Sequence, residues 1–206
     1  ENIEEIAFTK KLFPNFKNYT DIYYQAGILG SKTIMAHCVH LDSDEIKLIK
    51  KTKTKIAHCP TSNRFLMSGI MPFRSFQKQN LCMGLGTDVA GGYSLSMFNE
   101  MKEAVENSKS LFVFSQGKVS PPMSIAEAFY LATLGGAEVL SMQDQIGSLE
   151  KGKKADFLVL DYQSIDPMGD KSDYRRPEQI LSKLIYKADA SVVKKVFVNG
   201  EKVGKS

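Results

Sequence analysis

The sequence contains no tryptophan, and only three cysteines and three histidines stand among its 206 residues. The cysteines, Cys38, Cys59 and Cys82, are odd in number and lack disulfide spacing, which indicates free thiols in a reducing compartment. No run of eighteen apolar residues is present, so no membrane span is predicted. Residues 1–5 lack the basic and apolar regions of a secretory signal. We therefore expect a cytoplasmic protein without a membrane partner.

Excess charge of either sign is also lacking. The 27 basic and 23 acidic residues give a net charge of +4, spread along the whole chain. This balance is too weak and too scattered to indicate a nucleic-acid partner. The densest basic patch, residues 47–55, falls at the end of an expected helix, where positive charge favours the helix dipole. We interpret it as a solvated helix end rather than an anion site.

Strand and helix patterns alternate in the first part of the chain, as in βα units. The expected strands are 33–37, 55–58 and 81–88, and the expected helices begin near residues 43, 72 and 93. Residues 60–69 are expected to form a loop. A capping box at Ser124 and Glu127 then opens a further helix, which Gly135 and Gly136 are expected to close.

The pattern becomes richer in β structure after residue 145. A strand is expected at 157–160, and Pro177 is expected to open a helix over about 177–187. Asn199 and Gly200 lie between β-forming residues, which is the strongest short signal for a β-hairpin. The sequence therefore predicts an α/β part followed by a small β-rich module.

Ionisable residues follow the three expected strands of the first part: His37, His58 and Asp88. In parallel α/β folds, reactive side chains gather at the carboxyl ends of the strands, so a polar site is predicted there. A structural reading of each residue stays open, because strand-end histidines are commonly hydrogen-bonded and an Asp after Gly-Thr commonly caps a turn. The repeated Ala-His-Cys does not favour a structural zinc site, because adjacent strand residues point to opposite faces.

Three motifs resemble the last three barrel strands of the amidohydrolase superfamily, in the branch that deaminates purines and related rings. They are MAHCVHL at 35–41, AHCPTSN at 57–63 and GLGTD at 84–88. Within that branch, further segments are similar to the guanine deaminases, whereas adenosine-type relatives usually carry a Gly-Ala-Ala-Ser-type loop after the Asp. These segments are KNYT at 17–20, GTDVAGGYSLSM at 86–97 and ATLGGA at 132–137.

The resemblance implies an α/β fold: the C-terminal part of a TIM-type (β/α)8 metal-dependent hydrolase barrel plus part of a small β-sandwich domain. Residues 1–145 would supply the barrel strands and helices after the fifth strand. Residues 146–206 would return to the small β domain, because 146–157 resembles the superfamily's re-entry into it. The complete enzyme is expected to be a homodimer.

The family's barrel holds one zinc ion, whose ligands are a His-x-His pair, a further His and an Asp on the eighth strand. Only the last ligand is matched here, by Asp88. In guanine deaminases the further His belongs to a His-x-x-Glu-Asn stretch, and this chain opens with Glu1 and Asn2, so Glu1 would be the catalytic glutamate. The other reading of Glu1 is a frayed terminal residue.

The resemblance also implies a mechanism. Zinc would activate a water molecule, with Asp88 holding the metal and taking the proton of the water. His37 would orient the water and stabilise the charge that develops, and Glu1 would protonate the ring and the departing amine. Guanine would yield xanthine and ammonia. His40 and His58 are assigned no direct role, and Arg64 either reaches the mouth of the pocket or is a solvated loop residue.

One ligand cannot hold a catalytic zinc ion, which needs about three protein ligands. We therefore expect this chain to be an incomplete and, by itself, inactive part of the enzyme, with the remaining ligands in an absent N-terminal half. Two alternatives stay open. In the first, the enzyme acts on another aminated ring, of the adenosine or triazine type. In the second, the chain is a non-catalytic scaffold module.

Overall fold

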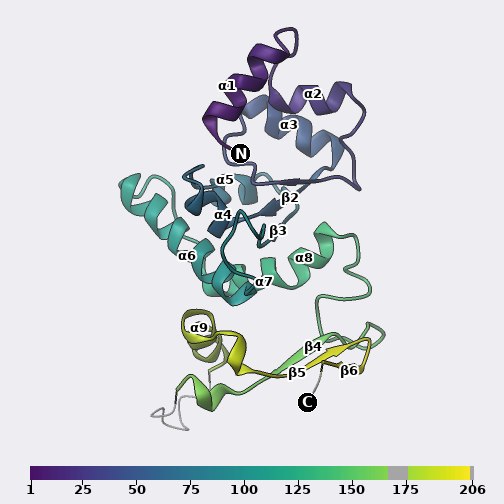
Figure 1. Cartoon of the computed structure of the whole chain (residues 1–206), viewed down its shortest axis with the longest axis vertical. Helices are drawn as coiled ribbons and strands as arrows, with labels where there is room; N and C mark the ends of the chain where they lie inside the picture. The colour runs from purple at the N-terminus through teal and green to yellow at the C-terminus, as the bar shows by residue number, and fades with distance from the viewer. Residues whose placement is uncertain (167–175, 205–206) are drawn as a thin grey trace.

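The strands are short and fall into two separate sheets. The computed structural model describes residues 1–166 and 176–204. Within them, a parallel sheet has the order β1-β2-β3 and an antiparallel sheet has the order β4-β5-β6. The parallel sheet lies among helices in the upper half of the molecule, and the antiparallel sheet closes the lower end, near the C-terminus (Figure 1).

The parallel sheet consists of β1 (Ile34–Ala36), β2 (Lys55–His58) and β3 (Met83–Leu85). All three strands occur where the sequence predicts them, but β3 is shorter than the expected 81–88. Its pairing with β2 stops at Leu85 because that residue lies opposite His58, the last residue of β2. The Gly86 N–H donates the next hydrogen bond to the His58 carbonyl, and the chain then leaves the sheet. The carboxyl ends of the strands therefore share one edge.

Two of the expected helices in this part begin as their capping signals predict. In α3 (Ser43–Thr52), Asp42 and Glu45 form a reciprocal capping box, and Lys53 ends the helix in the left-handed conformation with φ of 57°. In α7 (Ile125–Ala132), Ser124 and Glu127 form the capping box expected from the sequence. The other expected helices are present as α5 (Phe73–Lys78) and α6 (Met97–Phe114).

The helix after Ser124 ends differently from the prediction. We expected Gly135 and Gly136 to close it, but α7 ends at Thr133, and both glycines lie inside the next helix, α8 (Leu134–Val139). Their role is close packing. A Cβ on Gly84 of β3 would lie 2.9 Å from the Gly136 Cα, and one on Gly135 would lie 3.0 Å from a carbonyl oxygen of β3. The absence of side chains therefore lets α8 rest directly on β3.

The segment expected as a loop at 60–69 begins with a short helix, α4 (Pro60–Phe65), so that prediction is wrong. Proline is favourable in the first turn, where its missing N–H leaves no hydrogen bond unmade. Thr61, Ser62 and Asn63 are all buried, at 1% exposure or less. A polar segment of this kind is stable in the interior because its neighbours satisfy most of its hydrogen bonds, although the buried Asn63 Nδ2 has no partner within the described residues.

Two helices at the start of the chain, α1 (Ile3–Leu12) and α2 (Tyr19–Gln25), were not predicted. Asn2 and Asn18 cap them by accepting from backbone N–H groups three residues ahead. The apolar residues of α1 are spread around the helix instead of lining one face, so the segment lacks the apolar periodicity that reveals a helix. The Tyr19 hydroxyl donates to Glu5 over 2.7 Å and ties the two helices together.

The C-terminal part matches its predicted elements. Strand β4 (Phe157–Leu160) pairs with β5 (Val193–Val198), which forms a hairpin with β6 (Glu201–Val203). Asn199 and Gly200 have φ of 54° and 81°, as a type I′ turn requires. Two short 3-10 turns flank the sheet, at Tyr162–Ser164 and Ala190–Val192.

Helix α9 (Pro177–Lys187) lies between β4 and β5 in the chain but packs away from their sheet. It lies against α6 and α7 instead, and Ile185, at 2% exposure, joins the core that those helices share. Helix α9 therefore contacts helices that precede residue 145. The division of the chain into two domains at residue 145 stays a prediction. None of the helices in the described residues is long and apolar enough to cross a membrane.

The core lies between the parallel sheet and its helices. Ile56 of β2, Phe76 of α5 and Val105 of α6 are at most 1% exposed. Burial of each such side chain contributes about 1.5–3 kcal/mol. At the edge of this core, Arg74 donates to both carboxylate oxygens of Glu127. Burial alone would raise the pKa of Glu127, but the Arg74 guanidinium and other hydrogen bonds lower it to about 2.

Candidate functional site

Three polar side chains meet where the parallel strands end: Glu1, His37 and Asp88. The His37 Nε2 lies 3.6 Å from Glu1 Oε2 and 3.7 Å from Asp88 Oδ2. His37 follows β1 directly, Asp88 follows β3 and Glu1 precedes α1. The side chains of Glu1 and His37 are 18% and 15% exposed, whereas that of Asp88 is more open at 37%. The structure thus brings together the three residues that the resemblance singles out.

The backbone turns sharply at two of these residues. His37 has φ of 66° and Asp88 has φ of 46°, the left-handed region that non-glycine residues adopt rarely. Such residues cluster at functional sites, where the surrounding structure holds them in place. After Asp88, the Gly92 N–H donates to the Asp88 carbonyl over 2.6 Å and closes a tight loop.

Each of the three residues is hydrogen-bonded to a side chain near α4. Ser62 Oγ donates to Asp88 Oδ2 over 2.6 Å, and Asn63 Oδ1 lies 2.8 Å from His37 Nδ1. Ser68, just past the helix, donates from Oγ to Glu1 Oε1 over 2.6 Å. We assigned no role to these three residues from the sequence. The only signal was the polar run Thr-Ser-Asn directly after a strand end.

Residues beside the site are held uncharged. His58 is 3% exposed and lies on the same buried face of β2 as Ile56. Burial, and then the nearby His37, lower the pKa of His58 to about 3. Burial also raises the pKa of the Cys59 thiol to about 12. A neutral imidazole and a neutral thiol of this kind fit structural positions next to the site.

A buried carboxyl group lies behind α4. Glu100 of α6 is 0% exposed, and its two oxygens accept from the Thr61 backbone N–H and the Thr61 hydroxyl. Burial raises the pKa of Glu100, although the bonds from Thr61 oppose the shift. The Thr61 bonds make this carboxyl an anchor for α4.

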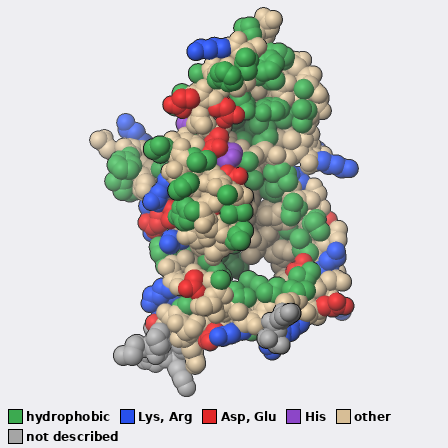
Figure 2. Space-filling model, viewed as in Figure 1, with side chains coloured by type: hydrophobic (Ala, Val, Ile, Leu, Met, Phe, Trp, Pro, Cys, Tyr) green, Lys and Arg blue, Asp and Glu red, His purple; other side chains and the backbone are tan. Residues whose placement is uncertain are grey.

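The remaining residues without a predicted role lie away from the centre of the site. His40 Nε2 lies 2.7 Å from the Ser68 carbonyl oxygen, so the ring contacts the backbone that follows α4. Arg64 pairs with Glu103 of α6 over 2.5 Å. In the space-filling view, histidine and acidic side chains lie together near the middle of the visible face, above a hollow lined with apolar side chains (Figure 2).

Comparison with known proteins shows the family. The model of the Amidohydrolase family matches residues 1–203, almost the whole chain. The chain belongs to the amidohydrolase family. A guanine deaminase from Dictyostelium discoideum is 37% identical over 203 residues, which are 98% of this chain and 45% of that protein. This amidohydrolase chain thus spans about half the length of the curated relatives that it matches.

Solved structures agree with this assignment. The guanine deaminase from C. acetobutylicum, a crystal structure with bound guanine in its active site, is 34% identical. It superposes with a TM-score of 0.89 over 99% of this chain and 47% of that one. An adenosine deaminase from Xanthomonas campestris with bound zinc is 28% identical, with a TM-score of 0.80 over 98% of this chain and 43% of that one.

The donors of this amidohydrolase chain fit zinc only in part. Asp88 offers a carboxylate oxygen and His37 an imidazole nitrogen, both of which are groups that zinc accepts. Among the residues that the structure describes, however, no three His, Cys, Asp or Glu side chains are arranged to hold a metal ion. The three cysteines there are free thiols. The remaining ligands of a zinc site would have to come from beyond the described residues.

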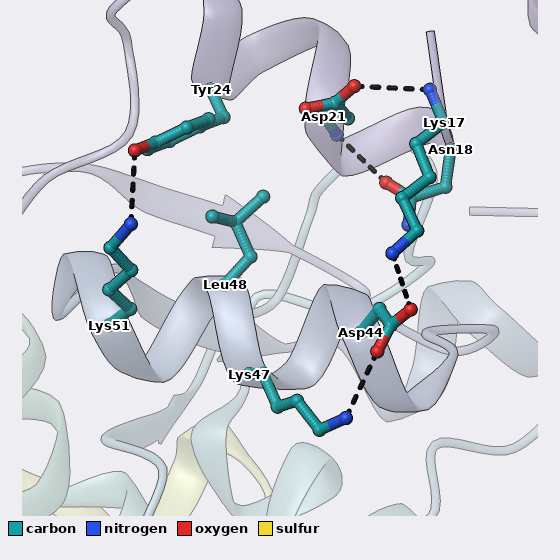
Figure 3. Close-up of a pocket in the computed structure, with 8 residues that line it drawn as sticks. All are labelled: Lys17, Asn18, Asp21, Tyr24, Asp44, Lys47, Leu48 and Lys51. Carbon is teal, nitrogen blue, oxygen red and sulfur yellow. Dashed lines mark hydrogen bonds and ion pairs between the residues drawn. The ribbon is translucent and has the colours of Figure 1, made fainter.

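A separate cavity of about 280 Å³ lies between α2 and α3 (Figure 3). Three lysines line it, and each of them is already bonded to a neighbouring side chain. Lys17 and Lys47 both bond to Asp44, over 2.6 and 3.1 Å, and Lys51 donates to the Tyr24 hydroxyl. The cavity includes none of the three site residues. We therefore regard it as a surface groove rather than a second anion site.

Proposed function

We propose that this chain is the C-terminal part of a zinc-dependent enzyme that deaminates guanine to xanthine and ammonia. In this proposal Glu1, His37 and Asp88 are the catalytic residues, and Asp88 is also a zinc ligand. One observation carries the proposal: two carboxylates flank the His37 Nε2, within 3.7 Å. The choice of guanine is supported by the similarity to guanine deaminases, one of which holds guanine in its active site.

The net reaction is a hydrolysis. A C–O bond forms at the ring carbon that carries the amino group, the C–N bond of that carbon breaks, and ammonia leaves. Zinc, when bound by Asp88 and by ligands from outside this chain, lowers the pKa of water and so supplies a nucleophile at neutral pH. The chain's own residues have to orient the water and move its protons.

The three side chains divide this work between them. Asp88 accepts the first proton that the attacking water loses, because a ligand of the zinc ion would lie beside the water that the ion activates. His37 orients this water through Nε2, the nitrogen that faces Asp88, and the Nε2–H stabilises the charge that develops in the tetrahedral intermediate. Glu1 delivers a proton to the ring nitrogen beside the attacked carbon, takes up the second proton of the added water and passes it to the departing amine, and the proton on Asp88 then restores Glu1.

The finer architecture is part of the same proposal. Residues 1–145 would be the last strands and helices of a TIM-type (β/α)8 barrel, and residues 146–206 part of a small β-sandwich domain. Three parallel strands in sequence order, with helices between them and polar residues at their carboxyl ends, support the first assignment. The antiparallel sheet of β4, β5 and β6 supports the second. A homodimeric state and a cytoplasmic location stay predictions.

The test is ammonia release by the full-length protein that contains this segment. With zinc bound, we expect turnover of guanine and little or none of adenosine or a triazine. The variant Glu1→Gln keeps the shape of the side chain but cannot donate the proton, and we expect it to lose at least about 100-fold in kcat. Preference for adenosine or a triazine would replace guanine as the substrate. Absence of activity on all three rings would favour the scaffold reading.

A further inference from the structure

One short segment contacts all three proposed catalytic residues. Ser62 and Asn63 lie in α4, and Ser68 lies three residues beyond its end. Their hydrogen bonds reach Asp88, His37 and Glu1 respectively, across 26, 26 and 67 residues of sequence. The three contacting residues are buried, at 0%, 1% and 4% exposure. A single rigid piece of chain thus holds side chains that come from three different parts of the sequence.

The segment is itself fixed from behind by α6. Glu100 accepts from Thr61, Glu103 pairs with Arg64, and Asn107 donates to the Pro60 carbonyl over 3.3 Å. The spacing of these residues, i, i+3 and i+7, places them on one face of the helix. All three are buried, at 0%, 7% and 2% exposure. A polar stripe on an otherwise apolar buried face is costly unless it is satisfied, and here every member bonds to α4.

We propose that Ser62, Asn63 and Ser68 are positioning residues, which fix the orientation of Asp88, His37 and Glu1 for the deamination. This inference rests on the proposed function and names the residues that make its geometry possible. None of the three needs to touch the substrate. They act through the side chains that they hold, as outer hydrogen-bond partners do in many metal-dependent sites.

Asn63 fixes the ring of His37. With its amide oxygen toward the ring, Asn63 accepts from the Nδ1–H, because an amide oxygen has no proton to give. The other nitrogen, Nε2, is then the one that faces Glu1 and Asp88. Loss of Asn63 would free the ring to rotate and to turn Nε2 away from the two carboxylates.

The two serines fix the carboxylates. Ser68 holds Oε1 of Glu1, so Oε2, the oxygen that faces His37, is left for proton transfer. Ser62 holds Oδ2 of Asp88 and so sets the plane of that carboxylate. A carboxylate that is free to rotate presents the required oxygen for only part of the time, and this loss lowers kcat rather than substrate binding.

The experiment compares matched variants of the full-length protein with zinc bound. Asn63→Leu and Ser68→Ala remove the positioning contacts, and Asn63→Asp keeps the acceptor toward Nδ1. Ser108→Ala is the control, because Ser108 is also buried at 7% and accepts one 2.7 Å bond, from the Met123 N–H, away from the site. The measurements are kcat and KM for guanine, the melting temperature and the zinc content.

We expect kcat to fall about 10- to 100-fold in Asn63→Leu and Ser68→Ala, with KM changed less than about twofold. Asn63→Asp should recover most of the loss. Ser108→Ala should lower the melting temperature at least as much and leave kcat unchanged. Unchanged kcat in Asn63→Leu and Ser68→Ala would overturn the inference. So would a loss of kcat that merely follows the melting temperature, with Ser108→Ala affected equally.

A second readout separates this inference from the proposed function. In protein labelled with 15N-histidine, long-range 1H–15N spectra show which ring nitrogen of His37 is protonated. We expect a protonated Nδ1 in the wild type and a changed spectrum in Asn63→Leu. An unprotonated Nδ1 in the wild type would refute the role of Asn63 even in an active enzyme. Conversely, a wild type without guanine deaminase activity would refute the function, while the spectra would still decide how His37 is held.

Discussion

At His37 and Asp88 the backbone adopts an unfavourable conformation, and this conformation sets the direction of the side chain. Both residues have positive φ, at a cost of about 1–2 kcal/mol each for a residue with a Cβ. His37 directly follows β1 and Asp88 lies three residues after β3, and each turn leaves its side chain at the sheet edge. The loop after Asp88 then has to double back at once, and that turn depends on Gly92.

We predict that Gly92→Ala disrupts the loop that carries Asp88. A Cβ at this position would lie 2.1 Å from the Thr87 carbonyl oxygen, so the backbone on one side must move. Because Asp88 is next to Thr87, we expect kcat to fall by about 100-fold or more, as for small displacements of catalytic groups. Gly30→Ala is the control, since a Cβ there meets nothing within 4 Å. Wild-type kinetics in Gly92→Ala would contradict the prediction.

A second prediction concerns His58 and acid stability. The folded pKa of about 3 lies below the model-peptide value of 6.5, so below pH 6.5 the unfolded chain binds a proton that the folded chain does not. The contribution of His58 to the free energy of unfolding is therefore complete above pH 6.5 and is lost as the pH falls toward 3. Between pH 7 and pH 5 this loss amounts to about 2 kcal/mol.

Urea unfolding at these two pH values checks the prediction in the wild type and in His58→Gln. Other titrating groups are common to both proteins, so the difference between the two pH dependences reports His58. We expect the variant to be less stable at pH 7 but to lose about 2 kcal/mol less on going to pH 5. Equal losses in the two proteins would show that His58 does not resist protonation.

The three residues with proposed catalytic roles could be found from the sequence because each lies in a segment that resembles a motif of the family. Ser62, Asn63 and Ser68 could not, because short polar residues after a strand usually form a solvated loop. Their burial depends on Glu100, Glu103 and Asn107, almost forty residues further along the chain. Local patterns carry no information about a partner at that distance.

At the scale of elements, capping residues predicted the starts of helices more reliably than apolar periodicity predicted which helices exist. α7 begins at its predicted capping box, and α3 begins at Ser43, where the sequence predicts the start of a helix. The helix α1 was missed because its apolar residues do not line one face, so its sequence lacks the apolar period of a helix. The glycines of α8 were misread as a stop because they serve close packing on β3.

The end of α3 offers a prediction at this scale. Lys53 adopts φ of 57° at the end of the helix and is exposed, so a glycine there would relieve the strain without losing a contact. We expect Lys53→Gly to raise the free energy of unfolding by about 0.5–1 kcal/mol. Lys50→Gly, at an exposed position inside the same helix, should instead lower it by about 1 kcal/mol. Thermal melts of both variants decide the point, and a destabilised Lys53→Gly would count against it.

For the molecule as a whole, both outer strands of the parallel sheet have one free edge. Within the described residues, β1 and β3 each pair only with β2. Unpaired strand edges and exposed apolar residues, such as Ile3, Phe8 and Leu12 of α1, favour association with other chains.

We predict that residues 1–206, purified alone with added zinc, neither deaminate guanine nor stay monodisperse. The residues that the structure describes offer too few ligands to hold the ion, because catalytic zinc needs about three from protein. A sensitive ammonia assay and light scattering test the two parts, with the full-length protein as the positive control. Turnover of guanine by the isolated chain would show that the site is complete without further residues.

The course of α9 has a consequence for how the molecule comes apart. The chain leaves the helical part after α8, builds β4, returns through α9 to α6, and only then completes the sheet with β5 and β6. The Ile185 side chain in the shared core and the hydrogen bond from Lys109 to Tyr186 hold α9 against α6. A protease that cleaves the backbone between α8 and β4 would therefore leave two fragments that stay associated, because α9 of the second fragment packs against α6 and α7 of the first.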